Sequence, residues 1–296
     1  MALKAWGELL DEAKINLWID PYRNAIEELV QIKKVGIVMA GNIPLVGFHD
    51  LLCVLVSGHF AKAKCSSEDE KLIPAIAGCL SLINPSFSEQ IELMEGKIEQ
   101  VDAIIATGTN NTSRYFEHYF GKYPNIIRKN RTGVAILTGK ESETDLNGLA
   151  CDVFSYFGLG CRNVSRLFLP KGYELNRLHQ AFSIYQYFGN HDKYRNNLDY
   201  FKSISLVNRT PFIDGGFYLM KENPQLESPV SVVNYTYYLS LDEVMHEINV
   251  NKERIQCVIC HDDLFPEAVQ PGKSQYPELW DYADGVDTMK FLCEKK

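Results

Sequence analysis

One cysteine stands in a setting that could support nucleophilic chemistry. Cys161 follows two glycines in the segment FGLGCR (157–162), between an apolar helical pattern and an apolar strand pattern. Glycines let a backbone approach a ligand closely, and a thiolate is a strong nucleophile. Arg162 and Arg166 carry positive charge that would favour the thiolate. From the residues alone Cys161 is a candidate nucleophile, and a packed, unreactive thiol is the alternative.

The other cysteine and glycine motifs fail on spacing. Cys257 and Cys260 belong to the haem-attachment string CVICH, but strand alternation places them on opposite faces, so we interpret them as structural thiols. The stretch 133–140 misses a P-loop because its second glycine is one place late and Glu141 stands where Ser or Thr would bind magnesium. The glycine fingerprint G-x-G-x-x-G is absent. These patterns predict no metal site.

Composition limits the class of protein. The chain has 296 residues, of which 46% are hydrophobic and 23% charged, as in globular proteins with about two domains. A net charge of −8 argues against nucleic acid or an anionic membrane as the main partner, although a local phosphate pocket stays compatible with it. No run of apolar residues is long enough to span a membrane. The N-terminus lacks the features of a secretory signal and cysteines are sparse, so we expect a cytoplasmic protein.

The first half of the chain alternates strand and helix patterns. The apolar runs VGIVMAG (35–41) and VDAIIATG (101–108) each end in glycine, as buried parallel strands entering loops do. Further strands are expected over 59–66, 125–129 and 132–139, and helices over 1–31 in two stretches, 44–56, 67–83 and 86–95. This alternation predicts an open parallel sheet with ligand-binding loops at its carboxyl edge.

The second half continues as α/β after Gly139, where we place the softest boundary. Apolar residues from Leu146 to Phe157 follow helical spacing, and Ser142 with Asp145 form a capping pair at the start. A strand over 165–169, a helix over 241–250 and the strand RIQCVIC follow. The predicted domains are 1–139, 140–268 and a C-terminal arm, 269–296, that returns to the first domain or to a partner subunit.

Four segments together resemble the aldehyde dehydrogenase superfamily, and more closely its LuxC-type acyl-CoA reductase branch. They occur in the family's order and each lies at a predicted strand end or turn. A weaker fifth segment, LESPVSVV (226–233), is similar to the family's E-x-F-G-P-V. The four are AGNIPLVG (40–47, W-N-F-P type), AKAKCSS (61–67, K-P-S-E type), ATGT (106–109, the T-G-S loop) and GLGCRNVSRLFLP (158–170, the nucleophile segment).

The resemblance implies a fold and a catalytic pair. The fold would be aldehyde dehydrogenase-like: two open α/β domains, 1–139 for cofactor and 140–268 for catalysis, with a cleft between them. Cys161 would take up an acyl group as a thioester. Asn42 would donate its amide to the oxyanion together with the Cys161 backbone N–H. By itself Asn42 is also compatible with a turn residue before Pro44.

The resemblance also implies a nicotinamide dinucleotide. Lys64 would hold the adenosine ribose or its phosphate, Thr107 to Thr109 would approach the pyrophosphate at a helix start, and Glu227 would orient the nicotinamide ribose. A solvated strand lysine and a strand-ending turn are the alternatives. The predicted cofactor-binding set is Lys64, Ser66, Ser67, Thr107, Gly108, Thr109 and Glu227.

Two departures from the family pattern refine the expectation. Hydrolytic members carry a glutamate base in an E-L-G-G-K-type segment, and the matching position here is Ile136. Without a base to activate water, exchange of an acyl group between two sulfurs is favoured. Ser67 replaces the acid of the K-P-S-E-type segment, which removes repulsion of a 2′-phosphate and favours NADPH, with NADH possible because Glu68 is adjacent.

We therefore expect an acyl-CoA reductase that reduces an acyl thioester to an aldehyde with NADPH through Cys161. Three alternatives stay open: an NAD(P)-dependent aldehyde dehydrogenase, a catalytically impaired binding or scaffold protein with this fold, and a phosphorylating semialdehyde dehydrogenase. Acyl-CoA or another acyl thioester is the expected partner. Aromatic residues of the C-terminal arm suggest a homo-oligomer, unless they close this chain's own core.

Overall fold

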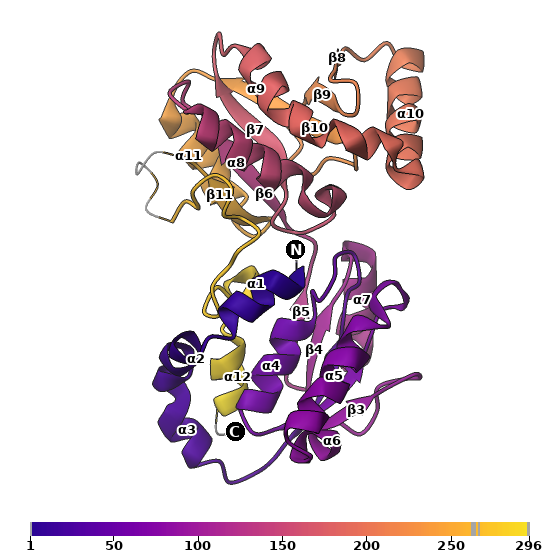
Figure 1. Ribbon diagram of the computed structural model, residues 1–296, viewed down its shortest axis with the longest axis vertical. Helices are drawn as coiled ribbons and strands as arrows, with labels where there is room; N and C mark the ends of the chain where they lie inside the picture. Colours follow the sequence, from indigo (N-terminus) through magenta and orange to yellow (C-terminus); the bar gives the residue numbers. More distant parts are fainter. Residues whose placement is uncertain (1, 262–264, 266, 295–296) are drawn as a thin grey trace. The chain divides into compact units, whose positions relative to one another are not determined.

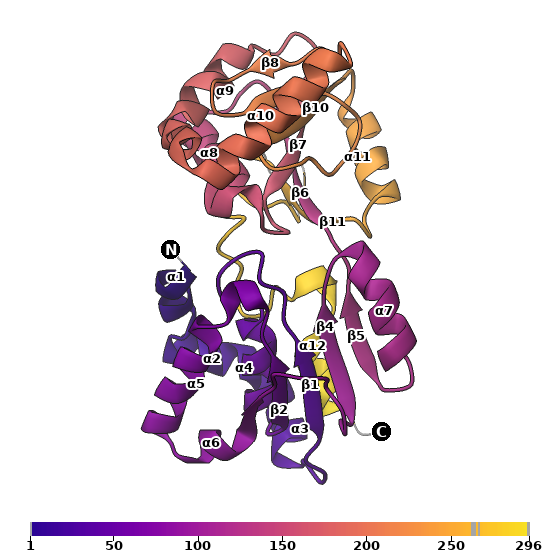
Figure 2. The same ribbon diagram turned by 90° about the vertical axis from the view of Figure 1, so that its right-hand side faces the viewer.

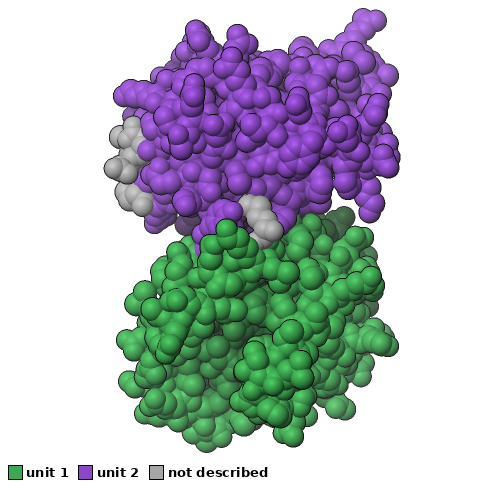
Figure 3. All heavy atoms as spheres, viewed as in Figure 1, with its two compact units in different colours: residues 1–130, 278–296 green, residues 131–277 purple. Residues whose placement is uncertain are grey.

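The chain folds into two compact units. The structure is a computed structural model that describes residues 2–261, 265 and 267–294 (Figure 1). Unit 1 consists of Met1–Asn130 together with Glu278–Lys296, and unit 2 of Arg131–Pro277 (Figure 3). The predicted boundary after Gly139 falls inside unit 2. From Glu278 onward the chain belongs to unit 1 again.

Unit 1 is built on a parallel sheet of five strands in the order β3-β2-β1-β4-β5. The central strands are buried on both faces, which explains their unbroken apolar sequences. The strands are β1 (Lys34–Val38), β2 (Phe60–Lys64), β3 (Ile91–Leu93), β4 (Ala103–Thr107) and β5 (Asn125–Arg128).

Helices cover both faces of this sheet (Figure 2). One face packs against α4, α5 and α12, and the other against α7, whose Phe116 and Phe120 contact Ile104 and Ala106. The α-helices are α1 (Ala2–Leu9), α2 (Glu12–Ile19), α3 (Arg23–Glu27), α4 (Phe48–Val56), α5 (Leu72–Ile83), α6 (Ser86–Gln90), α7 (Asn110–Phe120) and α12 (Thr288–Cys293). The 3-10 helices are η1 (Asp20–Tyr22), η2 (Ser67–Asp69) and η5 (Ala283–Gly285).

The returning C-terminal segment is fastened to unit 1 by buried polar contacts. Trp18 Nε1 donates to Tyr282 Oη at 2.8 Å. The His59 ring lies between the Lys33 N–H, which donates to Nδ1 at 3.3 Å, and the Leu292 carbonyl, 3.1 Å from Nε2. Leu292 and Tyr282 also join the apolar core of the unit. Tyr282 and Phe291 therefore pack in the core of unit 1, whereas Tyr276 and Trp280 are exposed.

Unit 2 contains a six-stranded sheet in the order β11-β6-β7-β10-β9-β8. All neighbours are parallel except β8, which runs antiparallel to β9. The strands are β6 (Thr132–Ile136), β7 (Val164–Pro170), β8 (Ile213–Asp214), β9 (Leu219–Glu222), β10 (Val232–Tyr238) and β11 (Ile255–Ile259). The helices are α8 (Glu143–Phe154), η3 (Ser155–Gly158), α9 (Leu175–Phe182), η4 (Ser183–Asn190), α10 (Asp192–Val207) and α11 (Leu241–Val250).

The mixed α/β fold with parallel sheets confirms the predicted fold class. The capping pair is present: Ser142 Oγ accepts from the Asp145 N–H, and the Asp145 carboxylate accepts from the Ser142 N–H at 2.8 Å. The expected helix over 86–95 is wrong in its second half, because Ile91–Leu93 forms β3 beside β2. No helix among the described residues is long and apolar enough to cross a membrane.

Candidate functional site

The carboxyl edge of the unit 1 sheet gathers most of the predicted cofactor residues. The chain leaves β1 and enters α4 on one face, and it leaves β4 and enters α7 on the other face. Adjacent parallel strands whose connections diverge in this way form a crevice at their carboxyl ends, where α/β sheets bind ligands. Around this point lie Asn42, Lys64, Ser66, Ser67, Thr107, Gly108 and Thr109.

The loops after β1 and β2 pack directly on each other. An added Cβ at Gly41 would collide with the Ser66 side chain, so only glycine permits this approach. The Asp69 carboxylate, 8% exposed, accepts a hydrogen bond from the Leu45 N–H at 2.7 Å. Leu45 has a φ of 62°, a strained conformation that this bond helps to hold. The segments 40–47 and 61–67 therefore form one structure.

Sequence reasoning missed Asp69, because it lies in an acidic run, SSEDE, that is typical of a solvated surface. Asn42 is exposed in the first of these two loops, and Lys64 ends β2 half-buried. The structure thus places both side chains at the predicted edge of the sheet. Their roles toward an oxyanion and a ribose stay predictions.

The start of α7 offers a phosphate-binding geometry. Thr109 caps the helix, with its Oγ1 accepting from the Thr112 N–H at 3.3 Å. Gly108 packs closely, since an added Cβ would lie 2.9 Å from Phe116 Cε2. Free N–H groups and the helix dipole favour an anion at such an end. The residues at this edge fit the pyrophosphate of a dinucleotide.

A buried cation next to this edge is already neutralised. Arg128, which pairs in register with Thr107, forms an ion pair with Asp50 and donates to Thr288 Oγ1 at 2.9 Å. Burial disfavours the charge of Arg128, but the Asp50 carboxylate outweighs it and raises the pKa of the guanidinium. Arg128 therefore serves the core of unit 1 and is not available as a phosphate ligand.

In unit 2, Cys161 occupies a tight turn directly before β7. The Asn163 N–H donates to the Gly160 carbonyl at 3.0 Å, so Cys161 and Arg162 are the two central residues of the turn. Cys161 is half-buried. Asn163 itself is 3% exposed. The turn thus presents a cysteine at the amino end of the central strand.

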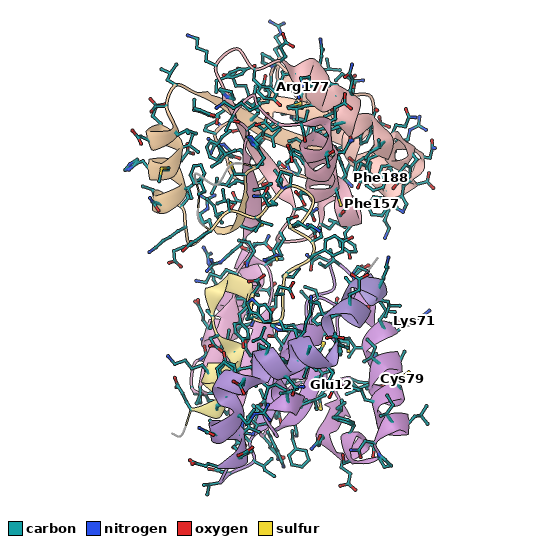
Figure 4. All side chains as sticks on the ribbon, turned by 60° about the vertical axis from the view of Figure 1, so that its left-hand side comes forward. Glu12, Lys71, Cys79, Phe157, Arg177 and Phe188 are labelled. Atoms are coloured by element: carbon teal, nitrogen blue, oxygen red, sulfur yellow. The ribbon has the colours of Figure 1, made fainter. Side chains whose placement is uncertain are left out.

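The approach to this turn is strained. Tyr156, Phe157 and Gly158 have successive φ values of 53°, 59° and 75°, in the left-handed region that non-glycine residues rarely adopt. Phe157 is held there by packing: its ring centroid lies 4.5 Å from that of Phe188 (Figure 4). Strain of this kind persists only where surrounding contacts over-determine the backbone.

Of the two arginines expected to favour the thiolate, only Arg162 stays beside Cys161. Arg166 was interpreted wrongly: its guanidinium pairs with Glu247 at 2.5 Å and lies 4.4 Å from the Phe168 ring centroid. Arg162 Nε donates to the Ser274 carbonyl at 3.0 Å. The charge of Arg166 is therefore compensated by Glu247.

The buried carboxylate of Asp152 holds the backbone segment whose Ser274 carbonyl accepts from Arg162. Asp152 is fully buried and accepts from the Gly272 N–H at 2.7 Å and the Ser274 N–H at 3.1 Å. Burial raises the pKa of Asp152 to about 6, against the lowering effect of these two hydrogen bonds. Cys257 lies nearby, with its Sγ 3.7 Å from the Arg162 carbonyl, and burial raises the pKa of its thiol to about 12. Such a thiol is inert, as expected for a structural cysteine.

The segment LESPVSVV meets the nucleophile segment. Ser165 Oγ donates to the Leu226 carbonyl at 2.5 Å. A small cavity lies between the two segments. It is lined by Val153, Phe154, Phe157, Gly158, Val164 and Ser165 on one side and by 228–233 on the other, with Tyr194; Cys161 is not part of the lining. Glu227 forms an ion pair with Arg254 at 2.6 Å, and both side chains are partly exposed. Any bond of Glu227 to a ribose would compete with this pair.

The position predicted to lack a base holds a buried side chain. Ile136 ends β6 with 2% exposure and packs with Phe168 and Val244. The nearest carboxylate along the chain, Glu141, is turned into its own loop, where it accepts from the Thr138 and Gly139 N–H groups. Glu141 follows β6, at the carboxyl edge of the sheet, whereas Cys161 precedes β7, at the amino edge. A strand as long as β6 separates these two edges by about 15 Å.

All eight cysteines are described, and none of them forms a disulfide. Among the described residues no group of His, Cys, Asp and Glu side chains could hold a metal ion.

Comparison with known proteins identifies the fold. No protein-family model matches the chain, and a search of curated proteins found no match. Solved structures do match. Indole-3-acetaldehyde dehydrogenase AldA from P. syringae, in complex with NAD+ and IAA, has a TM-score of 0.60 at 10% identity, over 80% of this chain and 57% of that one.

Two further structures agree. An aldehyde dehydrogenase from Mycobacterium tuberculosis complexed with NAD+ has a TM-score of 0.56 at 15% identity, over 73% of this chain and 54% of that one. Gamma-glutamyl-gamma-aminobutyraldehyde dehydrogenase from Burkholderia cenocepacia J2315 has a TM-score of 0.60 at 12% identity, covering 84% and 63%. This chain has the aldehyde dehydrogenase fold. It spans less than two thirds of the length of these proteins.

Proposed function

We propose that this chain is an NAD(P)-dependent oxidoreductase that oxidises an aldehyde through Cys161. The observation that carries the proposal is the half-buried cysteine in a closed turn before β7, in a chain with the aldehyde dehydrogenase fold. The carboxyl edge of the unit 1 sheet, with the capped start of α7, supports nucleotide binding. The NAD+ complexes of two matched proteins favour this chemistry over thioester reduction.

In this proposal each residue has a defined task. The Cys161 thiolate, favoured by Arg162, attacks the aldehyde carbonyl, and the Asn42 amide donates to the resulting oxyanion. The cofactor, when bound, would accept the hydride, which leaves the acyl group on Cys161 as a thioester. Water or an external thiol must then take the acyl group to free the sulfur. Thr107, Gly108 and Thr109 would hold its pyrophosphate at the start of α7. Lys64, Ser66 and Ser67 would contact its adenosine ribose, and Glu227 would orient its nicotinamide ribose.

A second candidate is reduction of an acyl thioester such as acyl-CoA by NADPH. This candidate comes from the resemblance, in which Ile136 matches the position of the hydrolytic glutamate. In the structure Ile136 pairs with Phe168, at the other end of β7 from Cys161, so its burial is no evidence about a base beside that cysteine. Transfer of the acyl group from the thioester sulfur to Cys161 requires no activated water. Ser67 in place of an acid supports NADPH in either direction of the reaction.

One experiment separates the candidates. The purified chain is mixed with NAD+ or NADP+ and aldehydes of increasing length, and separately with NADPH or NADH and acyl-CoA esters of increasing length. Nicotinamide absorbance reports turnover in both directions. Radiolabelled acyl-CoA should label Cys161 covalently only if the second candidate holds, and Cys161→Ala should not be labelled.

The result also tests the proposal as a whole. Turnover that survives in Cys161→Ala contradicts both candidates. Cofactor binding without turnover against either panel would instead indicate a catalytically impaired binding protein with this fold.

A further inference from the structure

Asn163 connects every part of the backbone around Cys161. Its Oδ1 accepts a hydrogen bond from the Gly160 N–H at 2.8 Å. Its Nδ2 donates to three carbonyl oxygens at the end of α8 and in η3. These are the carbonyls of Asp152 (2.9 Å), Val153 (3.3 Å) and Ser155 (3.0 Å).

The contacts of the Asn163 main chain extend this connection to the sheet. Its N–H closes the turn on Gly160, and its carbonyl accepts from the Gly133 N–H of β6 at 2.9 Å. This close approach of the two backbones requires glycine at position 133, because an added Cβ would lie 2.9 Å from the Asn163 carbonyl oxygen. One residue thus ties the end of α8, the turn and the sheet together.

The chemistry of these contacts requires a carboxamide. The last carbonyls of a helix lack partners within the helix, and burying them unpaired costs free energy. Here one amide nitrogen serves such carbonyls while the amide oxygen serves an N–H of the turn. A carboxylate would face the carbonyls with negative charge, and an aliphatic side chain would leave both sets unpaired.

We propose that Asn163 is the positioning residue of the nucleophile: its carboxamide fixes the turn, and through it the direction in which the Cys161 sulfur points. Asn163 contacts the two flanks of the turn and acts through the backbone, so it takes no part in bond making. The inference rests on the proposed role of Cys161, because a fixed sulfur matters only if the sulfur attacks.

The test needs a readout of the position of the sulfur as well as of turnover. Cys79 is exposed, and Cys65, Cys151 and Cys293 are half-buried like Cys161, so the experiment is done in a background in which these four cysteines are replaced by Ser. Cys161 is labelled with bromotrifluoroacetone, the site is checked by peptide mass spectrometry, and the 19F spectrum is recorded. The parent should give one narrow line. Asn163→Ala should give a shifted or multiple line and, in unlabelled protein, a kcat at least about tenfold lower with little change in KM.

Asn234→Ala is the matched control. Asn234 is 1% exposed and donates from Nδ2 to two carbonyls, those of Gln225 and Glu227, at 3.0 and 3.1 Å. This variant loses similar buried hydrogen bonds in the same unit, so it should lose thermal stability while the fluorine line of Cys161 stays unchanged. If Asn163→Ala does not fold, Asn163→Asp is measured instead. It keeps the shape and the acceptor for the Gly160 N–H but turns a negative charge toward the three carbonyls, so the fluorine line should again be shifted or multiple.

The outcomes separate the inference from the proposed function. An unchanged fluorine line and kcat in the Asn163 variants would overturn the inference, and so would an equal change of the line in Asn234→Ala. If Cys161→Ser retains turnover, the proposed function is wrong, yet the fluorine line still decides whether Asn163 positions the thiol.

Discussion

The two units place their candidate residues at opposite edges of their sheets. In unit 1 the candidate loops follow strands β1, β2 and β4, and they rest on glycine contacts, a helix start and one buried carboxylate. In unit 2 the candidate turn precedes β7, and buried polar side chains hold it, chiefly Asn163 and Asp152. The first arrangement leaves N–H groups open for an anion. The second uses its hydrogen bonds within the protein and so fixes one side chain.

This difference teaches that the two units are suited to different tasks. A helix start with a close glycine suits a ligand that is bound and released. A turn held through several buried hydrogen bonds suits a group that must keep one position during bond making. If the comparison holds, substitutions in unit 1 should act mainly on cofactor affinity, and substitutions at the turn mainly on kcat.

The largest effect is expected for Cys161→Ser. Turnover should fall on the order of 10³-fold or more, because a hydroxyl is a poor nucleophile without an activating base. Affinity for NAD(P)H should stay unchanged when followed by nucleotide fluorescence. A loss of cofactor affinity in this variant would show that the two tasks are not divided between the units.

Asn42→Ala tests the one residue of unit 1 that is assigned to the chemical step. Loss of an oxyanion donor should lower kcat by about 10²- to 10³-fold. Steady-state kinetics should show this with an unchanged cofactor affinity. If kcat falls by less than twofold, Asn42 is a turn residue. The candidate residues of unit 1 would then act on cofactor affinity alone, and those of unit 2 on kcat.

Asp152 makes the stability of unit 2 depend on pH. The folded pKa of about 6 lies above the ordinary value of 3.8, so the folded state binds the proton more tightly than the unfolded state. The free energy of unfolding should therefore fall as pH rises from about 4 to 6, by up to about 3 kcal/mol. Urea unfolding at several pH values measures this, and Asp152→Asn should show a smaller decrease. An equal decrease in that variant would assign the effect to another group.

Gly108→Ala should weaken cofactor binding by roughly tenfold, or about 1.4 kcal/mol, because the new methyl group forces Phe116 or the loop to move. Gly78→Ala in α5 is the matched control, since nothing lies within 4 Å of a Cβ added there. Fluorescence titration with NADPH compares the two variants. Equal affinities would remove the start of α7 from the proposed site.

The smallest effect is expected at the Glu227–Arg254 pair. Both side chains are about half exposed, so Arg254→Ala should lower stability by less than about 1 kcal/mol, and less at high salt. If Glu227 binds ribose, freeing it should also leave cofactor affinity equal or higher. A lower affinity would mean that Arg254 orients Glu227 for binding.

The sequence predicted the parts of the fold that local patterns specify. VGIVMAG and VDAIIATG form β1 and β4, because a strand buried on both faces is apolar throughout. The pair Ser142 and Asp145 begins α8, because a capping box is a local motif. β3 was missed since it has three residues and little pattern, and its pairing with β2 decides it.

The candidate site was less predictable, because its contacts join distant residues. Arg166 carries the same charge as Arg162, but its partner Glu247 lies 81 positions further along the chain. Asp69 and Asn163 stand in ordinary polar surroundings, and only the folded backbone gives them carbonyls and N–H groups to bind. Glycine spacing indicated the turn at Cys161, since the left-handed Gly158 is a local requirement.

Unit 1 contains residues from before and after unit 2, so it can be completed only late in synthesis. Its closing segment, with Tyr282 and Leu292, emerges from the ribosome only after all of unit 2. Until then Trp18 and His59 lack these partners, and the nascent unit 1 exposes the apolar surface that α12 later covers. Chaperone binding during translation should therefore concentrate on the first half of the chain and end once the segment from Glu278 has packed onto unit 1.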